Sequence, residues 1–138
     1  MRSIVLLVGA VDGAAAVPEF VRQAPDDVRV CVVLAGSAPI EGVDVIVVSA
    51  SPLRPLRKVT AKRAPRHIVD VLLRRSNAAG FERAGARNPA ALGALESADV
   101  IVALDADAVP LAWRAGRLNR SAAILNGLQA GLRALRVT

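Results

Sequence analysis

The chain of 138 residues has very few of the side chains on which metal sites and nucleophilic sites depend. It has one cysteine, Cys31, and one histidine, His67. A disulfide within the chain, a cysteine-based zinc site and a multi-histidine metal site are therefore excluded. Cys31 lies in an apolar run, as expected for a buried thiol, and His67 is the sole candidate for imidazole catalysis. We expect neither a metal nor a cofactor.

Aromatic residues are also scarce, with two phenylalanines, one tryptophan and no tyrosine. Hydrophobic residues make up 54% of the chain and most of them are Ala, Val and Leu, so the core must be aliphatic. So few aromatic rings offer little surface on which bases could stack, and no nucleic-acid-binding motif is recognisable. Nucleic acid is therefore the least favoured partner.

The sequence lacks an apolar run long enough to span a bilayer. Its N-terminus resembles a signal peptide, with Arg2 followed by an apolar stretch and small residues, but Asp12 and two glycines interrupt it. Because Ile4–Val8 also makes a good first strand, we expect a retained N-terminus. The protein is then expected to be cytoplasmic, and peripheral to the inner membrane face if it binds lipid.

The net charge of +6 comes from the middle of the chain, where residues 54–88 carry ten basic and two acidic side chains. A helix is predicted over Leu53–Arg63, with four basic residues on or near one face: Arg54, Arg57, Lys58 and Lys62. This basic stripe is interpreted first as a solvated helix face, second as a surface for anionic lipid and third as a nucleic-acid contact.

The strongest pattern is a strand, a turn and a helix over residues 97–117. Val100–Leu104 is apolar without polar alternation, which predicts a central strand covered on both faces in a parallel sheet. Asp105 follows it, at the end of the strand where open α/β sheets bind ligands; a turn-stabilising role for this residue is equally open. Asp107 is predicted to cap the next helix, because Pro110 then falls in the first turn, where its missing N–H costs nothing.

Four further strands are predicted, over Ile4–Val8, Val28–Leu34, Val43–Val48 and Ala122–Leu125. The link between the second and third strands, residues 35–42, is shorter than the usual helical crossover of about a dozen residues. Their pairing is therefore left open as parallel or antiparallel.

Helices are predicted between these strands. The first covers Ala14–Gln23 and starts near Val17 because Pro18 lies inside it. Others are predicted over Arg66–Arg75, ending at Ser76–Gly80, over Asn88–Glu96, and from Gly127 to Arg136. The alternation predicts an α/β fold, a three-layer Rossmann-like sandwich with a mainly parallel sheet of about five strands. We expect one domain over 1–138, with 54–97 as a basic helical insertion between the third and fourth strands.

A candidate site follows if the strand order is 3-2-1-4-5. The loop after the first strand and the turn after the fourth then face one crevice at the switch point. Backbone N–H groups there favour an anion or a sugar hydroxyl, and both glycines of the loop are expected to adopt conformations closed to other residues. The aspartates could hold magnesium, but turn and cap roles account for them without a metal. The candidate ligand-binding residues are Gly9, Asp12, Gly13, Asp105 and Asp107.

Several enzyme classes lack their signature here. Gly9–Gly13 is not a G-x-G-x-x-G loop and the second strand does not end in an acidic residue, which disfavours a dinucleotide-dependent oxidoreductase. There is no phosphate-binding P-loop and no G-x-S-x-G nucleophile turn.

The run Ala98-Asp-Val-Ile-Val-Ala-Leu-Asp105, followed by Asp107-Ala-Val-Pro-Leu-Ala-Trp-Arg-Ala-Gly-Arg117, resembles the N-terminal Rossmann-like domain of GT-B glycosyltransferases. The retaining, nucleotide-sugar-dependent branch is the most similar. The order of a glycine turn, a short link and a basic helical insertion is similar too. Val102-Ala-Leu104 departs from the histidine-containing family pattern, as does Leu125-Asn-Gly127 after the fifth strand.

The resemblance implies an acceptor-side domain that is catalytically incomplete without a donor-sugar domain. Its expected partners are a sugar or lipid-linked acceptor, an anionic membrane surface, and a separate donor domain or a second copy of the chain. No catalytic residue is assigned, and this chain alone is not expected to be an enzyme. The alternative is a non-catalytic Rossmann-like module that binds a protein or an anionic surface.

Overall fold

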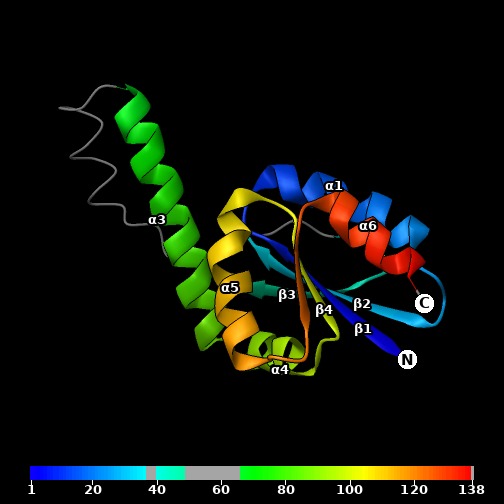
Figure 1. Cartoon of the computed structure of the whole chain (residues 1–138). Coiled ribbons are helices and arrows are strands. Elements are labelled where there is room, and N and C mark those ends of the chain that lie inside the picture. Colours follow the sequence, from blue (N-terminus) through cyan, green and yellow to red (C-terminus); the bar gives the residue numbers. More distant parts are fainter. Residues whose placement is uncertain (37–39, 49–65, 138) are drawn as a thin grey trace.

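Five parallel strands form one sheet in the order β3-β2-β1-β4-β5 (Figure 1). The structure is a computed structural model that describes residues 1–36, 40–48 and 66–137, with only the backbone at 11, 12 and 66–76. The strands are β1 (Arg2–Val8), β2 (Val28–Ala35), β3 (Asp44–Val48), β4 (Val100–Ala103) and β5 (Ala123–Asn126). This is the predicted α/β fold with a Rossmann-like three-layer arrangement, and the sheet meets the condition on strand order that the candidate site requires.

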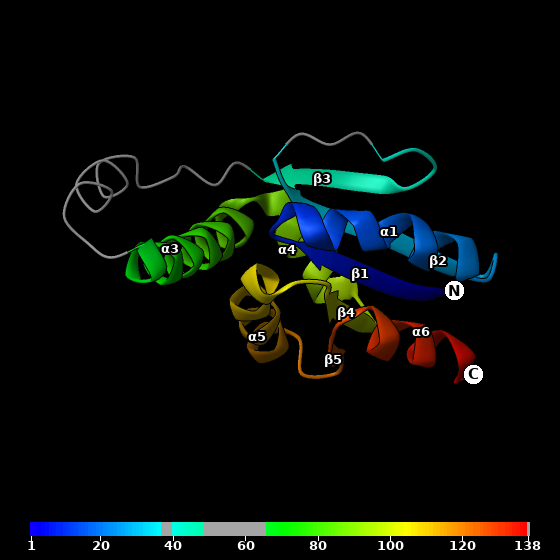
Figure 2. The same cartoon turned by 90° about the horizontal axis from the view of Figure 1, so that it is seen from above.

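Helices cover both faces of the sheet (Figures 1 and 2). One face packs against α1 (Val11–Gln23) and α6 (Leu128–Arg136). The other packs against α3 (Arg66–Arg87), α4 (Pro89–Ser97) and α5 (Val109–Leu118), the last entered through a short 3-10 turn, η1 (Ala106–Ala108). The central strands therefore have no solvent-facing side.

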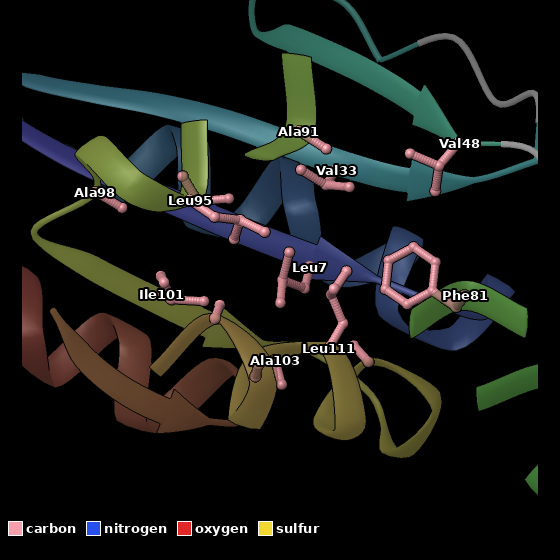
Figure 3. Close-up of a cluster of buried hydrophobic side chains, with 14 residues drawn as sticks. Leu7, Val33, Val48, Phe81, Ala91, Leu95, Ala98, Ile101, Ala103 and Leu111 are labelled. Carbon is pink, nitrogen blue, oxygen red and sulfur yellow. The ribbon is translucent and has the colours of Figure 1, made fainter. Parts of the chain in front are cut away.

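This arrangement explains why β1 and β4 consist of unbroken apolar runs. Val5 and Leu7 point into the cluster beneath α3, α4 and α5, whereas Ile4 and Leu6 point into the cluster beneath α1 and α6. A strand with both faces covered needs apolar residues at every position rather than at alternate ones. Figure 3 shows Leu7 among the strand and helix side chains of the first cluster.

The pairing of β2 with β3 is parallel, which decides the alternative left open by the sequence. Cys31 lies opposite Asp44, and Ala35 opposite Val48. Gly36 and Gly42, at the two ends of the short link, both have positive φ angles, of 96° and 78°. Glycine adopts this region without steric cost, so the chain can reverse sharply at both ends of the link.

Two predicted helix boundaries are wrong. α1 begins at Val11, not near Val17, and continues through Pro18. Pro18 itself is exposed, whereas Val17 and Phe20 of the same helix are fully buried. Burial of this helix face outweighs the proline.

The second error concerns Ser76–Gly80, where the sequence predicted the end of a helix. α3 runs through this segment to Arg87. Phe81 is fully buried, and Gly85 lies so close to Leu111 of α5 that a Cβ there would come within 2.6 Å of it. This packing outweighs the low helix propensity of Asn and Gly, which amounts to about 1 kcal/mol for a glycine. The first turns of α3 extend beyond the sheet (Figures 1 and 2).

Candidate functional site

The loop after β1 and the turn after β4 lie side by side at the carboxyl end of the sheet, and Asp105 joins them. Its carboxylate accepts hydrogen bonds from the backbone N–H of Gly9, at 3.3 Å to Oδ1 and 3.1 Å to Oδ2, and of Ala10, at 2.9 Å to Oδ2. Oδ1 also accepts from the N–H of Ala108, at 3.0 Å. One side chain therefore connects the start of α1 with the turn that leads into α5.

Asp105 is the capping residue. The prediction that Asp107 caps the helix, which was argued from the position of Pro110, is wrong. Asp105 has extended backbone and caps η1 by accepting from Ala108. The 3-10 turn takes up the residues between this cap and α5, so α5 begins at Val109 and Pro110 still falls in its first turn. Asp107 lies within η1. The turn-stabilising role that the sequence left open for Asp105 is the one observed.

Positions 9 and 13 need glycine because there is no room for a side chain, and not because of the backbone conformation. Neither has a positive φ angle, contrary to the expectation from the sequence. A Cβ at Gly9 would lie 2.8 Å from Cβ of Asp107, and a Cβ at Gly13 would overlap Oδ2 of Asp105. The glycines thus allow the helix start and the aspartate turn to come into contact.

The electrostatics of Asp105 combine two opposing effects. Burial raises the pKa of its carboxyl, and the nearby charge of Asp107 acts in the same direction. The hydrogen bonds from Ala10, Ala108 and Gly9 favour the ionised form and oppose the rise. The carboxylate lies at the N-terminal end of α1, where the helix dipole favours negative charge. Three backbone N–H groups donate to the carboxylate, so most of its acceptor capacity is used by the protein itself.

The structure brings four of the predicted site residues together and does not describe the side chains of the others. Gly9, Gly13, Asp105 and Asp107 are brought together, as the crevice prediction requires. Asp12 is in the first turn of α1, and its side chain is outside the described part of the structure. The four residues of the basic stripe, Arg54, Arg57, Lys58 and Lys62, lie outside the described residues.

Cys31 is only partly buried, on β2, rather than fully buried as its apolar surroundings suggested. Burial is the main cause that raises the pKa of its thiol, followed by the charge of Asp44 on β3. A raised pKa keeps the sulfur protonated, which disfavours it as a nucleophile. In the described ranges, no three His, Cys, Asp or Glu side chains are grouped so that they could hold a metal ion.

The sequence reasoning missed the outer face of α5. Trp113 has 66% of its surface exposed and Leu118 has 53%. Arg114 and Arg117 are exposed on the same face, which helical spacing predicts because residues three and four apart are neighbours. The sequence does contain a signal for this face. Leu111, Ala112 and Ala115 are the buried apolar residues of the helix, and their positions define the opposite face.

No helix within the described ranges has the length and apolar character needed to cross a membrane. Comparison of the chain with protein-family models, with curated proteins and with solved structures finds no match. A relation to GT-B enzymes stays a prediction from the motif of residues 98–117 and the order of the elements.

Proposed function

We propose that this chain is the acceptor-side domain of a glycosyltransferase-like enzyme and depends on a separate donor-sugar domain for transfer. The observation that carries the proposal is the bridge from Asp105 to Gly9 and Ala10 at the switch point of the 3-2-1-4-5 sheet. Open α/β sheets bind ligands at this point, outside the carboxyl ends of the strands. The bridge holds the loop after β1 and the turn after β4 in direct contact.

The residues have distinct roles in this proposal. Asp105 is a positioning residue, since its carboxylate oxygens already accept from backbone N–H groups. In this proposal the carboxylates of Asp107 and Asp12 accept hydrogen bonds from hydroxyls of the acceptor substrate. Gly9 and Gly13 leave the room in which Asp107 and Asp105 contact the segment after β1. This division assigns binding, and no bond-breaking step, to the chain itself.

An NMR titration tests the proposal. Short-chain alkyl glycosides below their micellar concentration and sugar phosphates are added to the labelled chain, with a sugar nucleotide as the donor-type comparison. We expect shifts confined to amides of residues 9–13 and 104–108, weaker in Asp107→Asn. The matched control is Asp99→Asn, which removes a carboxylate at the opposite end of the sheet, where Asp99 accepts from Ser3 N–H at 2.8 Å. Unshifted amides in both segments with every compound contradict the proposal.

The alternative function is a non-catalytic module that binds another protein or an anionic surface. The hydrogen bonds from three backbone N–H groups to the Asp105 carboxylate and the exposure of Trp113 favour it. It predicts no response to any glycoside. Sedimentation of the free chain at micromolar concentration tests the case in which the partner is a second copy, since self-association must depend on concentration.

The basic stripe is a separate part of this alternative. If Arg54, Arg57, Lys58 and Lys62 bind anionic lipid, replacement of Arg54, Lys58 and Lys62 by Ala lowers binding to acidic vesicles at low salt. Each cation near such a surface contributes about 1 kcal/mol, so the triple variant is expected to bind about 100-fold more weakly. Unaltered binding removes the stripe as a lipid contact.

A further inference from the structure

The outer face of α5 combines apolar and cationic side chains. Of the three aromatic residues in the chain, Phe20 and Phe81 are fully buried, whereas Trp113 is 66% exposed. Leu118, five residues further on and the last residue of α5, is 53% exposed. These two large apolar residues are not needed to fill the core, so both are available for contact with a partner.

Three exposed arginines lie on α5 or shortly after its end. Arg114 and Arg117 are exposed on the same helix, and Arg120 is exposed directly after it. Arg114 lies 3.7 Å from Glu82 of α3, whereas Arg117 and Arg120 form no ion pair within the described residues. The face therefore has an excess of positive charge around an exposed indole ring.

Packing on the inner side of α5 holds this face outward. Leu111, Ala112 and Ala115 are buried against the sheet and α3. A Cβ at Gly116 would lie 2.9 Å from the side chain of Ile124, so the helix is in close contact with β5. Rotation of α5 to bury Trp113 would expose this packed side. Figure 2 shows α5 beside α3 in the outer layer of the fold.

We propose that this face of α5, formed by Trp113, Arg114, Arg117, Leu118 and Arg120, binds the surface of an anionic phospholipid membrane. Tryptophan is favoured at the membrane interface, because its ring is apolar while its N–H can remain hydrated. Guanidinium groups pair with lipid phosphates and are attracted to the negative surface potential. A single convex helix face suits a flat, deformable lipid surface, whereas a peptide needs a groove or a free strand edge.

This inference is independent of the glycosyltransferase-like proposal, since it uses neither the crevice nor the basic stripe. It predicts membrane contact even if the chain binds no sugar. It also makes Trp113, the only tryptophan, an intrinsic reporter of the contact.

The test is the fluorescence of Trp113 in the full chain, with vesicles of phosphatidylcholine alone and of phosphatidylcholine with about one third phosphatidylglycerol. We expect a blue shift and quenching by brominated lipid with the acidic vesicles only, both reversed by high salt. Vesicle binding without a change in Trp113 emission would place the contact elsewhere and overturn the inference. Equal quenching by a single-stranded oligonucleotide at matched phosphate concentration would overturn it in favour of nucleic acid.

Variants give the second measurement, by cosedimentation with the acidic vesicles. Arg117→Gln with Arg120→Gln is expected to lower the partition coefficient about 25-fold, about fivefold for each charge. Trp113→Ala is expected to lower it about tenfold. The matched control is Arg133→Gln with Arg136→Gln, which removes the same charge from exposed positions on α6, in the opposite layer of the fold. A loss in this control equal to that of the first pair would overturn the assignment to α5.

Discussion

Gly13 and Asp105 share a space that only a glycine leaves open. Any Cβ at position 13 would overlap Oδ2 of Asp105, which accepts a hydrogen bond from Ala10 at 2.9 Å. A residue in the first turn of α1 is thus tied to the end of β4, although the two are far apart in the sequence. The contact defines the geometry of the candidate site.

Replacement of Gly13 by Ala tests this contact. Alanine is favoured over glycine within a helix by about 1 kcal/mol, but here the added methyl group must displace Asp105. We expect a net loss of about 1–3 kcal/mol in the free energy of unfolding, measured by urea denaturation.

Gly93→Ala is the matched control. Gly93 is exposed in α4, and nothing lies within 4 Å of a Cβ there. This variant is expected to gain up to about 1 kcal/mol. A stabilised Gly13→Ala variant would show that Asp105 moves aside freely. It would contradict a fixed contact between α1 and the end of β4.

Asp105 also makes a prediction about pH. Its folded-state pKa is raised, mainly by burial, so the folded chain binds this proton more tightly than the unfolded chain does. The resulting stabilisation is complete below the ordinary pKa of an aspartic acid and is lost as the pH rises through the folded-state value.

The comparison of wild type with Asp105→Asn isolates this contribution, because the other carboxyl groups cancel in the difference. Between about pH 7 and about pH 3.5, the wild type is expected to gain stability relative to the variant. A relative loss on acidification would mean that the backbone hydrogen bonds dominate and lower the pKa of the carboxyl.

Asn119 is predicted to be a major determinant of stability. It is 7% exposed, and its side-chain N–H groups donate to the carbonyl oxygens of Leu95 and Ala98, both at 2.9 Å. Asn119→Ala leaves two buried carbonyls without these donors and is expected to cost about 2–4 kcal/mol.

Asn119→Asp should be worse at neutral pH, because it replaces the donor with a buried negative charge facing two carbonyl oxygens. Thermal unfolding of the two variants checks this order. Aspartate tolerated as well as alanine would mean that the amide donors contribute little.

The strands could be predicted because their pattern does not depend on distant contacts. Continuous apolar runs such as Val100–Val102 and Ile4–Val8 indicate coverage on both faces, and the predicted boundaries agree with the structure within two residues. The position of Asp105 after β4 followed from the same pattern. Four of the five residues predicted for the candidate site are therefore found together at the switch point.

The helix boundaries failed where tertiary packing overrides local preference. Pro18 and Gly80 are helix breakers by propensity, but the burial of Phe20 and Phe81 beside them keeps both helices continuous. The function of Gly13 could not be read from the chain either, since its need for space arises from Asp105, a residue remote in sequence. Exposure of Trp113 depends in the same way on which face of α5 meets the sheet.

The pairing of β1 on both sides has a consequence for the order of folding during synthesis. Ile4 pairs with Val30 on one side and with Val100 on the other. The β1–β2 pair can form early, but the other edge of β1 stays open until β4 has left the ribosome. Closing so long a loop is entropically slow, and an unpaired strand edge is prone to pairing with other chains. The nascent chain therefore has its greatest risk of aggregation between the emergence of β1 and that of β4, and the Asp105 bridge can form only after that interval ends.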